Sequence, residues 1–145
     1  MNDMQQEFDF DSSPTMGELK LDAIKKLADD LLKFRLDIEA ALEYGNNSHS
    51  FDHIVDEVMQ GRLHLYPLKN SFIIMEVHKY PNFSVYHGFL AGGDLQEILD
   101  AHPMIIQNAK QLGCKGLSIA GRRGWEKAMK PHGWKHNLSY MYREI

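Results

Sequence analysis

The chain has 145 residues and a mass of 16.7 kDa, which fits one domain, because two cores of half that size would each be marginal. With 43% hydrophobic and 25% charged residues, the composition excludes a disordered or fibrous chain. No apolar run approaches the roughly 18 residues of a membrane span, and no basic residue precedes an apolar stretch at the N-terminus, so we expect neither a membrane helix nor a secretion signal. The lone Cys114 excludes an internal disulfide and a cysteine-rich metal site, and favours a reducing, cytoplasmic-type environment.

Charge is unevenly distributed along the chain. The formal net charge of −4 comes wholly from residues 1–17, which contain four acidic residues and no Lys or Arg. Residues 110–135, by contrast, are basic, with Glu126 as their only acidic residue. We therefore predict an acidic N-terminal arm over 1–17 and a domain over 18–145. The arm either pairs with a partner or with the domain, or it is a solvated terminus.

Two helices are expected before the first strand. Apolar residues recur with a period of 3.6 over 18–44, and because this length exceeds that of most helices, we expect a break near 33–35. Ser50 or Asp52 can cap a short second helix that ends at Gly61. The hydrophobic period then changes, which predicts strands over 63–67, 72–78 and 83–90, separated by turns at 69–71 and 80–82. Connections this short require an antiparallel meander.

The second half alternates helices and strands. Asp94 is placed to cap a helix, Pro103 predicts a kink or a restart, and Gly113 ends the segment. A buried strand is expected over 115–120, a short helix over 125–130 that Trp125 and Trp134 anchor on the sheet, and a final strand over 136–144. We thus predict an α/β (α+β) fold in which a central mixed sheet joins an antiparallel meander to a C-terminal β-α-β unit, preceded by two helices.

This element order resembles that of the acyl-CoA N-acyltransferase (GNAT) fold over about 19–145. More specifically, several short runs resemble small GNAT-like proteins of tailed phages and prophages. These runs are 61–67 (GRLHLYP), Tyr80-Pro81, 89–95 (FLAGGDL), 112–114 (LGC), 121–125 (GRRGW) and Gly133-Trp134. Because some short-tailed phages carry such a protein inside the virion, the resemblance makes a role in a particle an expectation for this chain.

The resemblance also places a cofactor loop. In this family an Arg/Gln-x-x-Gly-x-Gly/Ala loop leads into a helix whose N-terminus binds the pyrophosphate of acetyl-CoA. Here Phe89 stands at the Arg or Gln position, Gly92 and Gly93 are retained, and Asp94 replaces the final small residue. A carboxylate there would occupy the helix donors and repel a phosphate by about 1 kcal/mol at 4–5 Å in water-like surroundings, and more when partly buried. We therefore expect no bound cofactor. A tight strand-to-helix turn also accounts for the two glycines.

The resemblance also implies a proton donor, which is commonly a tyrosine on the last short helix. Met129 stands at that position and cannot donate a proton. Glu76 and His78 are weak candidates for a general base, because such a residue is more often a surface residue on a strand. We therefore expect a catalytically silent fold.

The remaining polar motifs give weaker signals. Arg122 and Arg123 could bind a phosphate, a carboxylate or an acidic partner. The eight histidines lack the spacing of a zinc site (His132 and His136 straddle a Pro/Gly turn), so we expect no metal. Nucleic-acid binding is not expected, because the net charge is negative and no basic-aromatic groove is evident. Cys114 is expected to be a small buried hydrophobe.

The function expected from the sequence is that of a phage virion or assembly protein that acts through contacts with other virion proteins. The acidic arm and the exposed side of the first long helix are the expected contact surfaces. Such a protein would be found in the virion, and in the host cytoplasm during assembly. The alternative is an acyl-CoA-dependent N-acetyltransferase with a degenerate cofactor loop, which would bind acetyl-CoA.

Overall fold

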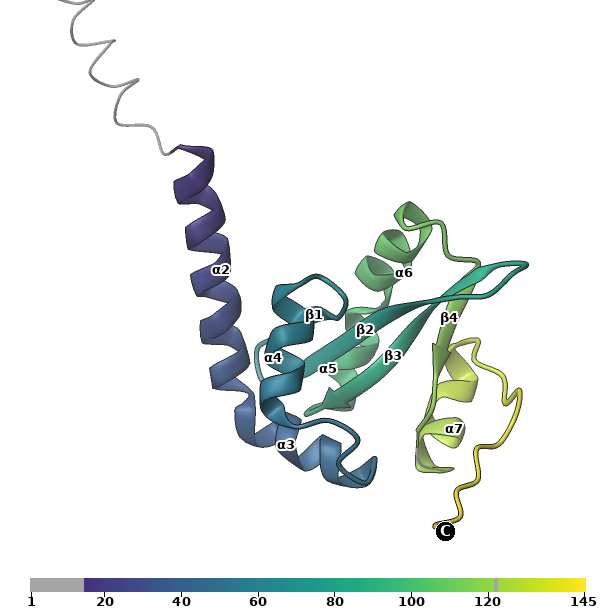
Figure 1. Cartoon of the computed structure of the whole chain (residues 1–145). Coiled ribbons are helices and arrows are strands. Elements are labelled where there is room, and N and C mark those ends of the chain that lie inside the picture. The colour runs from purple at the N-terminus through teal and green to yellow at the C-terminus, as the bar shows by residue number, and fades with distance from the viewer. Residues whose placement is uncertain (1–14, 122) are drawn as a thin grey trace, which may run out of the picture. The chain divides into compact units, whose positions relative to one another are not determined.

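A computed structural model describes residues 15–121 and 123–145, apart from the side chain of Arg123 (Figure 1). The chain divides into two compact units, one ending at Gly61 and the other beginning at Arg62. The predicted acidic arm lies almost wholly outside the described residues, so it stays a prediction. No helix in the described part of the chain is long and apolar enough to cross a membrane.

Over its described residues, 15–61, the first unit contains the helices α2 (Met16–Lys33), α3 (Arg35–Tyr44) and α4 (Phe51–Met59). The break predicted near 33–35 is confirmed, because Phe34 ends α2 and caps α3 with a non-helical backbone. The cap of α4 at Ser50 is also confirmed. The buried apolar residues of this unit are Leu31, Phe34, Ile38, Leu42, Phe51, Ile54 and Val58.

The start of α2 is set by a capping box two residues before the predicted position. The Glu18 N–H donates to Thr15 Oγ1 at 3.1 Å, and the Thr15 N–H donates to Glu18 Oε2 at 3.3 Å. This reciprocal pair gives partners to two N–H groups at the end of the helix. Residues 16 and 17, expected to belong to the acidic N-terminal arm, therefore lie in the first turn of α2.

Replacing Thr15 by alanine is expected to lower the free energy of unfolding by about 1 kcal/mol, because the substitution removes the acceptor for the Glu18 N–H. Urea unfolding followed by circular dichroism would measure the change. Thr15→Ser, which keeps the hydroxyl, is the matched control and should be close to neutral. Equal losses in the two variants would contradict a capping role.

The second unit contains a four-stranded sheet in the order β1-β2-β3-β4, formed by β1 (His64–Pro67), β2 (Phe72–Lys79), β3 (Ser84–Gly92) and β4 (Gly116–Ile119). β1, β2 and β3 are antiparallel, and β4 is parallel to β3. The predicted meander and mixed sheet are therefore confirmed. Between β3 and β4 lie α5 (Leu95–Asp100) and α6 (His102–Gln111), whose separation confirms the restart expected at Pro103. The chain continues with α7 (Arg123–Met129) and a 3-10 turn (Lys130–His132).

Helices α5 and α6 cover one face of this sheet (Figure 1). The core on that face is formed by buried residues of the strands and the two helices, namely Tyr66, Ile73, Met75, Tyr86, Ile98, Ala101, Ile105 and Ala109. Leu117, Cys114 and Trp125 pack against it while partly exposed. Trp125 therefore contacts the core as predicted, and Cys114 is a half-buried apolar contact.

The final strand predicted over 136–144 is wrong. The described residues from Trp134 to Ile145 have no regular secondary structure, and the exposed side chains include Leu138 and Tyr140. In the described sheet, β4 is consequently an edge strand. This is why its residues are half-buried or exposed, rather than buried as predicted, with Ile119 at 37% exposure.

Candidate functional site

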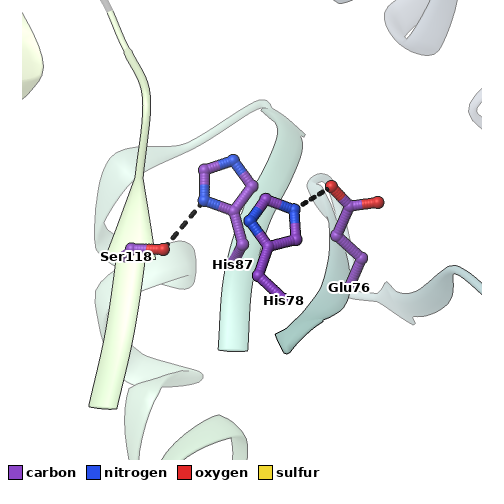
Figure 2. Close-up of polar contacts among 4 residues, drawn as sticks. All are labelled: Glu76, His78, His87 and Ser118. Carbon is purple, nitrogen blue, oxygen red and sulfur yellow. Dashed lines mark hydrogen bonds and ion pairs between the residues drawn. The ribbon is translucent and has the colours of Figure 1, made fainter. Parts of the chain in front are cut away.

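Figure 2 shows a polar cluster of Glu76, His78, His87 and Ser118. These residues alternate along their strands with core residues that pack under α5 and α6, so the cluster lies on the opposite face of the sheet. The strand register creates it. Glu76 on β2 is paired directly with His87 on β3, and His78 lies two residues further along β2, so the three side chains project from the same face. His87 is in turn paired with Ser118 on β4. Four residues from three strands therefore meet at one place.

The cluster is held by two hydrogen bonds and one ring stack. His78 Nε2–H donates to Glu76 Oε1 at 2.6 Å, and His87 Nδ1 is 2.8 Å from Ser118 Oγ. The two imidazole rings stack with their centroids 4.4 Å apart and an angle of 19° between their planes. All four side chains are half-buried, so the site can be reached from solvent while the surrounding sheet fixes it.

Burial lowers the pKa of His87 below its ordinary value, and the neighbouring His78 lowers it further, an effect that Glu76 opposes in part. His87 is thus held as a neutral imidazole that bonds Ser118 through Nδ1. Glu76 with His78 forms a carboxylate–imidazole pair capable of accepting a proton. The arrangement can therefore serve acid–base chemistry or ligate a cation.

Sequence reasoning named two members of this cluster and missed the other two. Glu76 and His78 were expected on one strand, and the structure brings them together. His87 and Ser118 were missed because their proximity depends on register. The signal that could have found His87 is the turn at 80–83, in which the Tyr80 N–H donates to the Phe83 carbonyl at 2.9 Å. This turn places Lys79 opposite Ser84, and Glu76 opposite His87 follows.

The predicted cofactor loop forms a tight turn against a second turn of the chain. Gly93 has a φ of +111°, and a Cβ built there would lie 2.5 Å from Ser71 Oγ and 2.7 Å from the Asn70 carbonyl oxygen. A Cβ on Gly92 would lie 2.8 Å from the ring of Phe72. Close packing therefore explains both glycines without a ligand, as one of the two interpretations of the sequence anticipated.

Two backbone N–H groups at the N-terminus of α5 have partners within the chain. Asp94 caps the helix by accepting from the Gln96 N–H at 2.9 Å, and its own N–H donates to Ser71 Oγ at 2.8 Å. Glu97 adds a second carboxylate to the first turn, where it accepts from the Asn70 N–H at 2.9 Å. Two N–H groups that a pyrophosphate would need thus have partners, and two negative charges stand beside them.

The other predicted residues lie away from the polar cluster or outside the residues that the structure describes. Met129, at the position where the resemblance implies a proton donor, is a buried apolar residue on α7. Trp134 is half-buried and packs edge-on against the ring of His102, with centroids 5.7 Å apart. Arg122 and the side chain of Arg123 lie outside the described residues, so their anion or partner contact stays a prediction.

Comparison with known proteins identifies the fold. No family model matches the chain, and a search of curated proteins finds no significant match. Among solved structures, an acetyltransferase of Trypanosoma brucei matches 66% of this chain and 78% of its own with a TM-score of 0.51 and 9% identity. A protein of Clostridium difficile described as a possible acetyltransferase matches 81% of this chain and 91% of its own, with a TM-score of 0.53 and 12% identity. The fold is GNAT-like. At these identities the similarity concerns the fold, and the predicted fold class is confirmed.

Proposed function

We propose that this protein uses a GNAT-like fold as a binding scaffold, acting through protein–protein contacts without acyl-CoA chemistry. The observation that carries the proposal is the chemistry at the start of α5. The Asp94 carboxylate and the Ser71 hydroxyl each accept a hydrogen bond from a backbone N–H group there, and Glu97 adds a second negative charge. A pyrophosphate would have to displace the Asp94 carboxylate and overcome its repulsion. Met129 in the expected proton-donor position supports the same conclusion.

The first helix supports a role in protein contacts. Over its 18 residues α2 has only one buried residue, Leu31, while Leu21, Ile24 and Leu32 are each at least half exposed. Apolar side chains gathered on one helix at this exposure are typical of an interaction surface. We propose that this helix, with the acidic segment before it, contacts a partner protein.

The finer proposal is that the partners are other proteins of a tailed-phage virion, which the chain meets in the host cytoplasm during assembly and in the finished particle. Its support is the set of sequence motifs at 61–67, 89–95 and 121–125. Mass spectrometry of purified virions is the test. Presence of the chain at a stoichiometric level supports the role, and its absence from the particles contradicts it.

A second candidate is an acyl-CoA-dependent N-acyltransferase. The solved structures that share the fold favour it over a virion role, since those cited above are described as acetyltransferases or possible acetyltransferases. The Glu76–His78 pair could supply the base that accepts a proton from an amine. The carboxylates of Asp94 and Glu97 at the start of α5 instead favour the non-enzymatic proposal.

Thermal unfolding with acetyl-CoA separates the two candidates. At about 1 mM acetyl-CoA we expect no change in the Tm of the wild-type protein, because only a ligand that binds the native state stabilises it. Asp94→Asn keeps the helix cap and removes the charge, and Asp94→Gly removes both. Both variants should gain affinity for acetyl-CoA if the carboxylate is what excludes the pyrophosphate. A clear rise in the Tm of the wild-type protein would contradict the proposal and favour the acyltransferase.

A further inference from the structure

The polar cluster on β2, β3 and β4 has the composition of a metal site. Glu76, His78 and His87 each offer one ligand atom, and these three atoms all lie within 4.8 Å of one another. Two ligand atoms of a tetrahedral zinc ion stand about 3.3–3.6 Å apart, because each lies about 2.0–2.2 Å from the metal. Rotations of these half-buried side chains that bring the most distant pair of atoms together by up to about 1.5 Å would give that separation.

From this geometry we propose that Glu76, His78 and His87 bind one divalent transition-metal ion of the zinc type. Two imidazole nitrogens and one carboxylate oxygen suit Zn²⁺ or Co²⁺ better than Mg²⁺ or Ca²⁺, which prefer oxygen ligands. Three protein ligands leave at least one coordination position for water or another ligand. The proposal does not depend on the function proposed above.

The surroundings of His87 match those of a metal-binding histidine. Its Nδ1 lies 2.8 Å from Ser118 Oγ, and this contact leaves Nε2 as the ligand atom. A partner on the second ring nitrogen is the usual way in which a ligating histidine is oriented. Ser118 is therefore a positioning residue, which acts on the metal through His87.

Binding at His78 requires one change of proton position. In the structure, Nε2–H of His78 donates to Glu76 Oε1 at 2.6 Å. If the imidazole carries its proton on Nδ1 instead, Nε2 and the Glu76 carboxylate both have lone pairs for the cation. No proton need leave the protein in this change, because neutral histidine holds its one proton on either nitrogen. The hydrogen bond thus places two ligand atoms side by side.

The strand register explains why these ligands are pre-positioned. Glu76 and His78 alternate along β2 on one face, and His87 is the direct partner of Glu76. Ligands on the strands of a sheet are held more rigidly than ligands on loops, so less conformational entropy is lost when they bind the ion. This cluster differs in that respect from the half-buried His49 and the exposed His53, whose rings are 6.4 Å apart near the start of α4.

The test is a titration of the untagged, chelator-treated chain with Co²⁺, followed by visible absorption and by competition with Zn²⁺. We expect one ion per chain, visible bands that Zn²⁺ abolishes, and a rise in Tm with either metal. Glu76→Gln and His87→Gln should each weaken binding about a hundredfold or more, and Ser118→Ala about tenfold. His136→Gln, which changes an exposed histidine on the C-terminal segment, is the matched control and should bind as the wild type does.

Two outcomes would overturn the proposal. One is the absence of saturable binding by the wild-type chain. The other is binding that persists unchanged in His87→Gln but is lost in a His49→Gln, His53→Gln double variant, which would place the ion on α4. Circular dichroism of each variant shows whether the fold is kept. If His87→Gln fails to fold, the Co²⁺ spectra of the wild type and of Ser118→Ala still test the proposal. About tenfold weaker binding by Ser118→Ala supports it, and equal binding by the two proteins contradicts it.

Discussion

Replacing Gly93 by alanine is expected to lower the free energy of unfolding by about 3–5 kcal/mol, a large share of the stability of a domain of this size. Two costs add. The φ of +111° strains any residue with a Cβ, at about 1–3 kcal/mol, and overpacking of a tight contact costs about as much again. The new methyl group would lie 2.5 Å from Ser71 Oγ and 2.7 Å from backbone atoms of residues 70 and 71, which cannot move aside as a flexible side chain could.

Chemical denaturation of the wild type and of two glycine variants would measure this loss. Gly113→Ala is the matched control, because Gly113 also has a positive φ, +76°, but no atom lies within 4 Å of its built Cβ. The control should lose only about 1–2 kcal/mol from backbone strain. If both variants lost the same free energy, close packing between the β3–α5 turn and Ser71 would not be the reason for Gly93.

Replacing Tyr86 by phenylalanine is expected to lower the free energy of unfolding by about 2 kcal/mol. The phenol is fully buried, and its oxygen lies 2.8 Å from Tyr66 Oη and 2.6 Å from His64 Nδ1. Asn108 Nδ2 extends the network by donating to Tyr66 Oη at 2.9 Å. Removing one hydroxyl takes a partner from two buried or half-buried polar groups, and each such loss costs about 1–3 kcal/mol before relaxation.

The same residue predicts how stability depends on alkaline pH. Burial raises the pKa of Tyr86 well above its ordinary value, and the hydrogen bond and charge of Tyr66 raise it further. Above pH 10 the unfolded chain therefore releases this proton while the folded chain keeps it. Because the unfolded state then binds fewer protons, the free energy of unfolding falls as pH rises through this range. The stability that the protonated Tyr86 contributes is fully present below pH 10.

Unfolding measured between pH 8 and about pH 11 would check the prediction, because an unshifted tyrosine titrates near pH 10. The wild type should lose stability more steeply above pH 10 than Tyr86→Phe does. Tyr140→Phe, at an exposed tyrosine, is the control and should retain the wild-type slope. Equal slopes for the wild type and Tyr86→Phe would contradict the assignment.

Local signals explain which parts of this fold could be predicted from sequence. The break at Phe34, the cap at Ser50 and the restart before Pro103 depend on residues close together in the chain, and all three are found where expected. The antiparallel meander follows from the shortness of its turns. The retained glycines also marked the β3–α5 turn correctly. The contacts that require them, of Gly93 with Ser71 and of Gly92 with Phe72, join residues 22 and 20 positions apart and could not be predicted.

Features that depend on distant partners could not be predicted in this way. Leu138, Tyr140 and Tyr142 alternate as in a strand, yet a strand needs an edge to pair with, and alternation alone does not supply one. In the candidate site, Glu76 and His78 were visible as neighbours on one strand. His87 and Ser118 join them only through the pairing of β2 with β3 and of β3 with β4. A pairing register shifted by one residue would have placed the side chains of His87 and Ser118 on the opposite face of the sheet.

The register of β3 also limits which changes in chain length the protein can tolerate. The turn at 80–83 fixes the pairing of residues 84–88, and the register shift opposite Ile74 and Met75 then accommodates one extra residue at Phe89, so that Ala91 faces the helix-covered core. An insertion or deletion between Ser84 and Gly93 would move the polar cluster or take the glycine away from Ser71. Length variation among related chains should therefore fall outside this segment, for instance in the exposed residues 45–48 between α3 and α4.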